Sequence, residues 1–466
     1  MSVSIWWIRR DLRLTDNFAL VSALNYSDEI LPVFILDPQL LKSKYVGEKR
    51  LDFLFNNLRD LDRNLRQRGS RLILRHGNPL EELVKISTET RTTAVFAEPD
   101  YSPYARRRDQ AVSNILPVHW CGSPAVHPPG SVLRSDGEPY TVFTPFSRTW
   151  KSLPLPDISS FHPTPQRIQT PSQTSSLEIL EVAGEKISFP AGEREAQERL
   201  QAFVGGNRNP IYQYKEMRNR PDIEGTSVLS PYLRFGILSA RQAAVEAKSA
   251  IQNAPDGNSR QSAETWLNEL IWRDFYIHIL YHFPIVRTQN FRLGKIAWQN
   301  NRQDFTTWCE GSTGYPIVDA GMRQLVATGW MHNRVRMITA SFLTKDLLVD
   351  WRWGERFFMQ HLIDGDPAAN NGGWQWTAGT GTDAAPYFRI FNPVLQSKKF
   401  DLYGNYILEW LPELANVPLE YIHEPWKMPP EIQKSTRCSI GEHYPAPIVD
   451  HHWARERALR AFSKAQ

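Results

Sequence analysis

The 466-residue sequence has only three cysteines and no long apolar run. Cys121, Cys309 and Cys438 lie far apart in the chain, which excludes a disulfide framework and a four-thiolate zinc or iron-sulfur site. No stretch approaches the ~20 uninterrupted apolar residues that a membrane-spanning helix needs. The short apolar start soon meets Arg9 and Arg10, so it does not fit a signal peptide. We therefore expect a cytoplasmic protein with no membrane partner.

The sequence also lacks the most recognisable nucleotide-binding patterns. There is no G-x-x-x-x-G-K-[ST] segment, so ATP hydrolysis has no support. Residues 379–384 fit the G-x-G-x-x-A pattern of dinucleotide sites, but no strand pattern precedes them and no βαβ unit contains them. We do not expect a dinucleotide site at that position.

Tryptophan, in contrast, is abundant. The chain has 16 Trp, and nine of them fall between Trp266 and Trp376.

Basic residues are concentrated too: Lys and Arg outnumber Asp and Glu by 12 to 8 within residues 201–300, although the formal net charge is only +4. This regional excess suits a partner with phosphates, whereas a solvated surface would explain the same count.

Short apolar runs alternate with helical periodicity over the first 122 residues. The runs at 5–8, 30–36, 71–74, 94–97 and 118–120 predict strands. Their alternation with helical segments predicts an α/β domain with a doubly wound parallel sheet. Such a sheet binds ligands at the carboxyl ends of its strands, which here means near residues 9–11, Asp37 and Asp100.

Two further parts follow this α/β domain. Eleven prolines fall between Pro124 and Pro190, so residues 123–193 are interpreted as an interdomain connection. Beyond it, strand signals almost vanish, and residues 194–466 are predicted to form an all-helical domain. The helical periodicity is clearest at 194–203, 240–251, 266–281, 317–328 and 331–348.

One helix carries a carboxylate between two indoles. Helical spacing places Trp266, Glu269, Trp272 and Arg273 along one side. Such a carboxylate is costly to dehydrate unless something pairs with it. Either Arg273 neutralises Glu269 within a core helix, or the indoles stack on a flat ligand whose N–H groups donate to Glu269.

Three other segments carry polar groups that suit a nucleotide. Asn333, Arg334 and Met337 share a helix face and offer an amide, a guanidinium and a thioether, although an ordinary amphipathic helix has the same pattern. Residues 362–376 concentrate carboxylates, amides, glycines and tryptophans, which favours contact with a sugar or a ring over a purely structural loop. The hydroxyl and N–H groups of residues 226–230 are a weak signal for phosphate binding.

Together these segments resemble the photolyase/cryptochrome family over nearly the whole chain. The likeness is most specific at residues 266–272, 313–319, 330–334 and 364–376. The resemblance implies light-driven DNA repair, in which excited reduced FAD gives one electron to a cyclobutane pyrimidine dimer that splits and returns it. It also accounts for the tryptophans, since the family's fold surrounds a folded FAD with indoles.

The resemblance implies site residues by matching positions. Glu269 and Asn370 match the catalytic positions, with Asn370 facing the flavin N5 atom. The positions that match FAD-binding residues are Tyr214, Thr226, Ser227, Val228, Leu229, Ser230, Trp266, Glu269, Arg273, Arg336, Asp364, Gly365, Asp366 and Asn370. Those that match residues for the lesion and DNA are Arg218, Glu269, Trp272, Asn333, Arg334, Met337, Trp376 and Gln396. Trp374, Trp351 and Trp298 match the chain that carries electrons to oxidised FAD, although core aromatics would also fit there.

Two features of the sequence distinguish members of the family. Repair of (6-4) photoproducts uses two histidines where this chain has Asn333 and Met337, which favours cyclobutane dimers. Asn370 resembles the repair enzymes, because plant and animal cryptochromes tend to carry Asp or Cys there. A signalling cryptochrome is the alternative within the family. A non-catalytic flavin or nucleotide-binding module is the alternative outside it, and would be favoured if Glu269 and Trp272 were buried away from any opening.

The second, light-harvesting pigment is expected between the domains. Where folate-binding members carry Asn-Glu, this chain has Pro103 and Tyr104, while Asp37 and Asp100 resemble members that hold a deazaflavin. We therefore expect 8-hydroxy-5-deazaflavin near Asp37, Asp100 and Arg234, with FMN, FAD or folate as alternatives. The expected partner is ultraviolet-damaged DNA, bound by a monomer.

Overall fold

The computed structural model describes residues 2–172, 174–179, 189–205, 209–292, 294–386 and 388–465. Contacts divide the chain into two compact units. The first consists of Met1–Lys215, Ser227–Pro284 and Ile363–Ala368, and the second of Glu216–Thr226, Ile285–Leu362 and Ala369–Gln466. The boundaries 1–122, 123–193 and 194–466 rest on sequence pattern and stay a prediction. Within that predicted connection, Gln173 and residues 180–188 lie outside the described residues.

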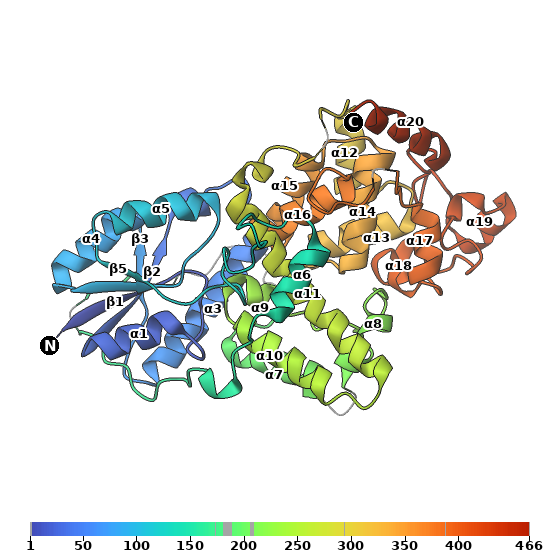
Figure 1. The fold of residues 1–466 in the computed structure, drawn as a ribbon. Coiled ribbons are helices and arrows are strands. Elements are labelled where there is room, and N and C mark those ends of the chain that lie inside the picture. Colours follow the sequence, from blue (N-terminus) through green and yellow to red (C-terminus); the bar gives the residue numbers. More distant parts are fainter. Residues whose placement is uncertain are drawn as a thin grey trace. The chain divides into compact units, whose positions relative to one another are not determined.

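The first unit contains the predicted parallel sheet, which is confirmed. Its strands are β1 (Val3–Ile8), β2 (Glu29–Leu36), β3 (Ile73–His76), β4 (Ala94–Ala97) and β5 (Val118–Trp120), all parallel and in the order β3-β2-β1-β4-β5. Helices α1 (Phe18–Tyr26) and α3 (Glu48–Arg66) cover one face, and α4 (Pro79–Thr90) and α5 (Pro103–Ser113) cover the other (Figure 1). Because both faces are covered, β1 is buried along its whole length.

Helices complete the first unit. They are α2 (Pro38–Leu41), α6 (Phe143–Ser152), α7 (Glu193–Gly205), α9 (Ser230–Phe235), α10 (Ala240–Gln252) and α11 (Gly257–His282). Helix α6 lies inside the predicted connection and packs against α11. Buried Asp274 of α11 accepts hydrogen bonds from the Trp150 indole at 2.9 Å and from the Val126 amide at 3.0 Å. These bonds fix the start of the proline-rich segment to the helix that carries Glu269.

The second unit is helical in its described residues. Its helices are α12 (Arg302–Cys309), α13 (Pro316–Thr328), α14 (Asn333–Ser341), α15 (Trp351–His361), α17 (Pro393–Phe400), α18 (Asn405–Trp410), α19 (Pro430–Thr436) and α20 (His451–Ser463). Two more, α8 (Tyr214–Met217) and α16 (Pro367–Ala378), begin in the first unit and end in the second. No helix among the described residues is both long and apolar enough to span a membrane.

The structure divides the segment 331–348, which was predicted as one helix. Helix α14 ends at Ser341, and a π-helical turn follows over Phe342–Asp346. Within this turn Lys345 is fully buried, and its ammonium group donates to the Ala378 carbonyl at 2.8 Å. A π-helical turn inside a helix is rare, and apolar periodicity does not distinguish it from a continuous α-helix.

The segment 313–319 has a structural role. The buried carboxylate of Asp319 accepts from the Thr313 amide at 2.7 Å, the Gly314 amide at 3.0 Å and the Tyr444 hydroxyl at 2.6 Å. Burial raises the pKa of Asp319. This carboxylate therefore ties the start of α13 to a segment near the C-terminus.

Candidate functional site

The loop 226–230 has an unusual backbone. Val228 has φ +49°, a left-handed conformation that is a genuine outlier for a β-branched residue. The next residue, Leu229, is right-handed with φ −88° and ψ −4°. Consecutive residues of opposite hand turn their N–H groups toward one side and form a concavity that attracts anions. Strain of this kind persists where the surroundings enforce it and clusters at ligand sites.

Contacts from two other segments hold this loop. The indole of buried Trp266, on α11, donates to the Ser227 hydroxyl at 3.3 Å. The hydroxyl of Ser230 donates to the Asp364 carboxylate at 2.6 Å. Tyr214 is also buried in this unit. The first unit thus brings together residues that are far apart in sequence and that were predicted to bind FAD.

Helix α11 presents the central carboxylate. Its N-cap is Asp256, whose side chain accepts from the Ser259 amide at 2.8 Å. Glu269 and Trp272 both retain partial exposure. The guanidinium of Arg273 donates to the Pro124 carbonyl at 2.6 Å and to the Leu233 carbonyl at 3.1 Å, and burial lowers its pKa. Arg273 therefore joins α11 to neighbouring backbone.

A partly buried ion cluster lies beyond the carboxyl end of β1. Arg10 pairs with Asp366 at 2.7 Å and with Asp100 at 3.7 Å. Arg234 donates to the Gly365 carbonyl at 2.9 Å, and burial together with the nearby Arg10 lowers its pKa to about 9. The cluster joins two antenna candidates, Asp100 and Arg234, to the FAD candidate Asp366. Sequence reasoning did not assign Arg10 a role, although its position after the first strand was a signal.

The third antenna candidate has its own partner. Asp37 accepts from the hydroxyl of Tyr104 and caps α2 through the Gln39 amide at 2.9 Å. A cavity beside the ion cluster is lined by Arg10, Asp100, Tyr101, Ser102, Pro124, Ile277, Leu280, Asp366, Pro367 and Ala368, and its volume is about 10 Å³. That volume holds about one water molecule.

The second unit contains the predicted flavin-facing amide. The Asn370 side chain, on α16, donates through Nδ2 to the Glu355 carbonyl at 3.0 Å. Glu355 in turn pairs with Arg287 at 2.8 Å. With Nδ2 held in this way, Oδ1 is the amide atom that is suited to accept a hydrogen bond. Arg336 donates through Nε to the Met331 carbonyl at 2.8 Å.

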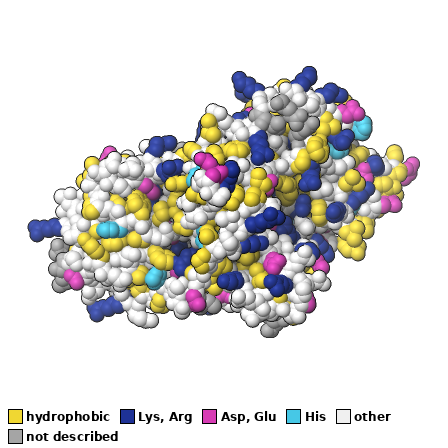
Figure 2. Space-filling model, in the orientation of Figure 1, with side chains coloured by type: hydrophobic (Ala, Val, Ile, Leu, Met, Phe, Trp, Pro, Cys, Tyr) yellow, Lys and Arg dark blue, Asp and Glu magenta, His cyan; other side chains and the backbone are white. Residues whose placement is uncertain are grey.

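Basic side chains of the second unit crowd together. Arg334 donates through Nη2 to the Asn219 side chain at 2.7 Å and lies over the Phe400 ring at 4.3 Å. Burial and the neighbouring charge of Arg218 lower the pKa of Arg334 to about 10. Two neighbouring guanidinium groups are suited to bind an anion, because a phosphate would relieve their mutual repulsion. Lys and Arg side chains also appear in several groups on the face shown in Figure 2.

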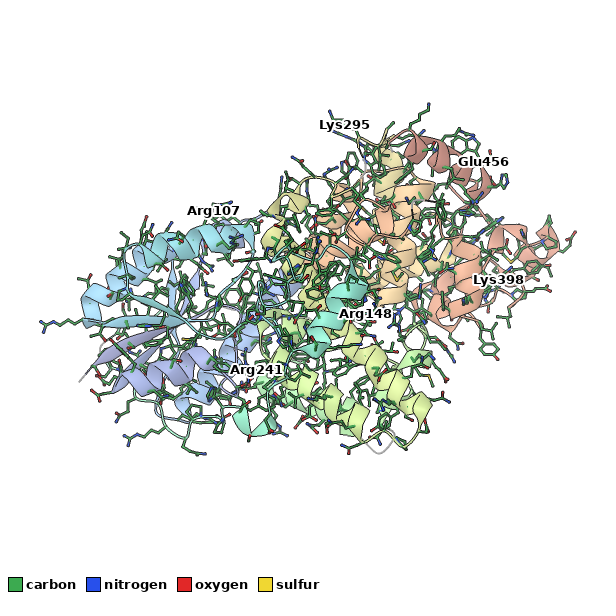
Figure 3. All side chains as sticks on the ribbon, viewed as in Figure 1. Arg107, Arg148, Arg241, Lys295, Lys398 and Glu456 are labelled. Atoms are coloured by element: carbon green, nitrogen blue, oxygen red, sulfur yellow. The ribbon has the colours of Figure 1, made fainter. Side chains whose placement is uncertain are left out.

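Other predicted lesion residues lie in the same unit. Asn333 is exposed at the start of α14, and its amide lies 3.9 Å from the Met337 sulfur, so these two side chains share a face. Trp376 on α16 and Gln396 on α17 are both partly exposed. Figure 3 marks Lys398 on α17, which pairs with Glu424 at 2.6 Å.

The three tryptophans of the expected electron path also lie in the second unit. Trp374 is buried and meets Phe358 edge-on, with ring centroids 4.9 Å apart. Trp351 is fully buried, and its indole donates to the Asn290 side chain at 2.9 Å. Trp298 is partly exposed and meets Phe462 edge-on at 5.6 Å. Exposure thus increases from Trp374 and Trp351 to Trp298.

The predicted residues divide between the two units. The first holds Asp37, Asp100, Tyr214, Ser227, Val228, Leu229, Ser230, Arg234, Trp266, Glu269, Trp272, Arg273, Asp364, Gly365 and Asp366. The second holds Arg218, Thr226, Trp298, Asn333, Arg334, Arg336, Met337, Trp351, Asn370, Trp374, Trp376 and Gln396.

Known proteins match this chain along its length. Residues 4–168 match the family described as DNA photolyase, and residues 266–464 match the family described as FAD binding domain of DNA photolyase. The deoxyribodipyrimidine photo-lyase of Synechococcus sp. is 41% identical over 98% of this chain and 95% of its own length.

Solved structures of photolyases also match this chain. A class III photolyase from Agrobacterium tumefaciens matches with a TM-score of 0.92 and 35% identity, over 100% of this chain and 98% of that one. An archaeal photolyase from Sulfolobus tokodaii with two FAD molecules matches with a TM-score of 0.83 and 33% identity, over 99% of this chain and 100% of that one. The sheet and the helical FAD-binding region define a flavin-binding protein of two parts. The chain belongs to the DNA photolyase family.

Proposed function

We propose that this chain is a deoxyribodipyrimidine photo-lyase, which repairs cyclobutane pyrimidine dimers in DNA with light. The main support is that almost the full length of this chain matches a relative with that name. The partial exposure of Glu269 and Trp272 supports it, because burial of both residues away from any opening would have favoured a non-catalytic binding module. The match of residues 266–464 to an FAD-binding family supports FAD as the cofactor.

The residues of the first unit fit an FAD. The N–H groups around Val228 suit the diphosphate, and the hydroxyl of Ser230 is already oriented by Asp364. Trp266 holds the same loop through Ser227. FAD, when bound in its reduced state, supplies the light-excited electron that splits the dimer. The protein residues bind and orient this group and shield it from water.

Polar groups near the flavin and the lesion have distinct tasks. The Oδ1 atom of Asn370 suits an N–H donor, as the flavin N5 position offers in its reduced state. Glu269 accepts hydrogen bonds from the N–H groups of the pyrimidines, and Trp272 and Trp376 give flat surfaces for stacking. As photolyases generally do, the enzyme takes the lesion out of the duplex, which costs less for a poorly stacked dimer.

Asn333 and Met337 support cyclobutane dimers as the substrate. They stand where members that repair (6-4) photoproducts have two histidines. Their contact at 3.9 Å places an amide and a thioether on one face of α14. Neither group transfers a proton near neutral pH, whereas splitting a cyclobutane ring by electron transfer requires none.

For the antenna we propose 8-hydroxy-5-deazaflavin near Asp37, Asp100 and Arg234. Asp37 and Asp100 lie after the ends of β2 and β4, where a doubly wound sheet binds its ligands. FAD is the second candidate, because the Sulfolobus tokodaii relative holds two FAD molecules. FMN and folate are further alternatives. The absorption spectrum of the native protein distinguishes these pigments.

We further propose that the enzyme works as a cytoplasmic monomer, with its free cysteines suited to a reducing compartment.

Illumination tests the repair activity. The reduced holoenzyme is mixed with oligothymidylate that contains dimers, and absorbance near the thymine band is followed in light and in darkness. We expect absorbance to recover only in light. A cryptochrome would undergo flavin photochemistry without this recovery, so a lack of light-dependent recovery contradicts the proposed function.

A further inference from the structure

Phe143 and Trp272 form an unusually flat aromatic pair. Their ring centroids lie 3.7 Å apart, and their planes differ by 1°. Such a short separation between parallel planes means that the two rings overlap almost completely. Phe143 therefore covers one face of the Trp272 indole, whereas the Trp272 side chain remains partly exposed.

Ordinary aromatic packing does not favour this arrangement. Aromatic pairs prefer offset or edge-to-face contacts with centroids about 4.5 to 7 Å apart, because stacked ring faces repel through their quadrupoles. The contacts of Trp272 with its own helix follow that preference, since Phe275 meets it edge-on at 5.7 Å and Tyr276 is tilted at 5.5 Å. The overlap with Phe143 must therefore be imposed by the backbone that carries the phenyl ring.

Helix α6 provides that constraint. Phe146, one turn beyond Phe143, is buried and meets Phe275 at 5.1 Å. Trp150 is buried too and donates to Asp274 at 2.9 Å. Arg148 is exposed on the same helix (Figure 3). One face of α6 is thus fixed on α11, and this places the phenyl ring against the indole.

We propose that Phe143 is a positioning residue for lesion binding: it holds the Trp272 indole in the plane on which an extruded pyrimidine stacks. This inference rests on the proposed function, in which Trp272 is a stacking surface. A free indole on the protein surface would sample several rotamers and would lose that freedom when the lesion binds. Because Phe143 stacks on one face of the indole, the Trp272 side chain is already ordered before the lesion binds. The loss of rotamer freedom therefore does not weaken binding.

The test compares Leu and Tyr at position 143. The F143L variant keeps an apolar side chain of similar size but has no ring, whereas F143Y keeps the flat ring. Binding of FAD-loaded protein to dimer-containing oligothymidylate is measured in darkness. We expect F143L to weaken binding about threefold to tenfold, which corresponds to ordering one side chain, and F143Y to bind like the parent. Turnover in light at saturating DNA should stay within about twofold in both variants, because Phe143 orders Trp272 before the lesion binds.

A matched control separates positioning from general stability. F146L makes the same substitution on the same helix, at a ring that contacts Phe275 instead of Trp272. We expect F146L to lower the melting temperature without weakening binding by the folded protein. If F143L and F146L weaken binding equally, or if F143L binds like the parent, the positioning role is wrong.

The W272A variant distinguishes this inference from the proposed function. If Trp272 stacks on the lesion, W272A weakens binding, and adding F143L to W272A causes no further loss. Unchanged binding by W272A would contradict the stacking role within the proposed function. Weak binding by W272A together with parent-like binding by F143L would contradict only the role of Phe143.

Discussion

The indole of Trp374 lies directly against the backbone of Gly354. A Cβ atom at position 354 would fall 2.1 Å from the Cη2 atom of the indole and 2.6 Å from the Cδ2 atom of Leu343. Both neighbours are buried. Glycine at this position therefore lets α15 approach the tryptophan that is predicted to begin the electron path.

We expect G354A to destabilise the protein by about 1 to 3 kcal/mol, because the added methyl group overpacks a closed core. Urea denaturation measures the change, and tryptophan fluorescence should show a displaced indole. Gly373 is the control, since a Cβ there meets no atom within 4 Å and the residue lies in α16. G373A should stabilise the protein by about 0.5 to 1 kcal/mol through helix propensity. Equal stability of G354A and the parent would show that the side chains around position 354 accommodate the added methyl group without destabilising the protein.

Replacing Trp298 tests the electron path. Trp298 is the partly exposed member of the three tryptophans, so it is predicted to exchange electrons with external donors. We expect W298F to abolish most light-driven reduction of oxidised FAD, while chemically reduced W298F should still repair dimers. The absorbance of oxidised flavin under illumination measures the first effect. Photoreduction at the parent rate would remove Trp298 from the path.

Buried Lys345 should make stability depend on pH. Burial lowers its pKa from 10.5 to about 7, so between these values the unfolded chain binds a proton that the folded protein does not. The contribution of Lys345 to the free energy of unfolding is therefore lowest below pH 7 and rises with pH up to about 10.5. The free energy of unfolding of the parent, relative to K345M, should rise by about 1 kcal/mol per pH unit between pH 7 and pH 9.

Urea denaturation of both proteins at several pH values checks this slope. K398M is the control, because Lys398 is exposed and pairs with Glu424 on the surface. Its difference from the parent should change little over the same range. A pH-independent difference between K345M and the parent would mean that Lys345 keeps an ordinary pKa.

Removing Arg218 should reduce the salt dependence of DNA binding. Burial and the nearby positive charge of Arg218 lower the pKa of Arg334, and both residues are predicted to bind DNA or the lesion. We expect R218A to lower the slope of log K against log salt concentration by about 0.9, the value for one phosphate contact on duplex DNA. Exposed Arg194 on α7, which pairs with Glu198, is the control for loss of a charge. If R218A and R194A change the slope equally, Arg218 is no specific phosphate contact.

The sequence by itself predicted much of the architecture. The strands were visible because a sheet covered on both faces requires continuous apolar runs, as β1 shows. Helical spacing likewise placed Glu269 and Trp272 on α11, since such spacing is a local property. The shared face of Asn333 and Met337 follows from the same rule.

Only the tertiary structure decided which distant segments meet. The pairing of Arg10 with Asp366, the bonds of Asp319 to Tyr444 and the stacking of Phe143 on Trp272 join residues that periodicity does not relate. Periodicity indicates which side of a helix or strand is buried. Which residue of a distant segment contacts that side depends on how the whole chain folds. The abundant tryptophans show this limit, because their number was evident from the sequence while their neighbours and exposure were set by packing.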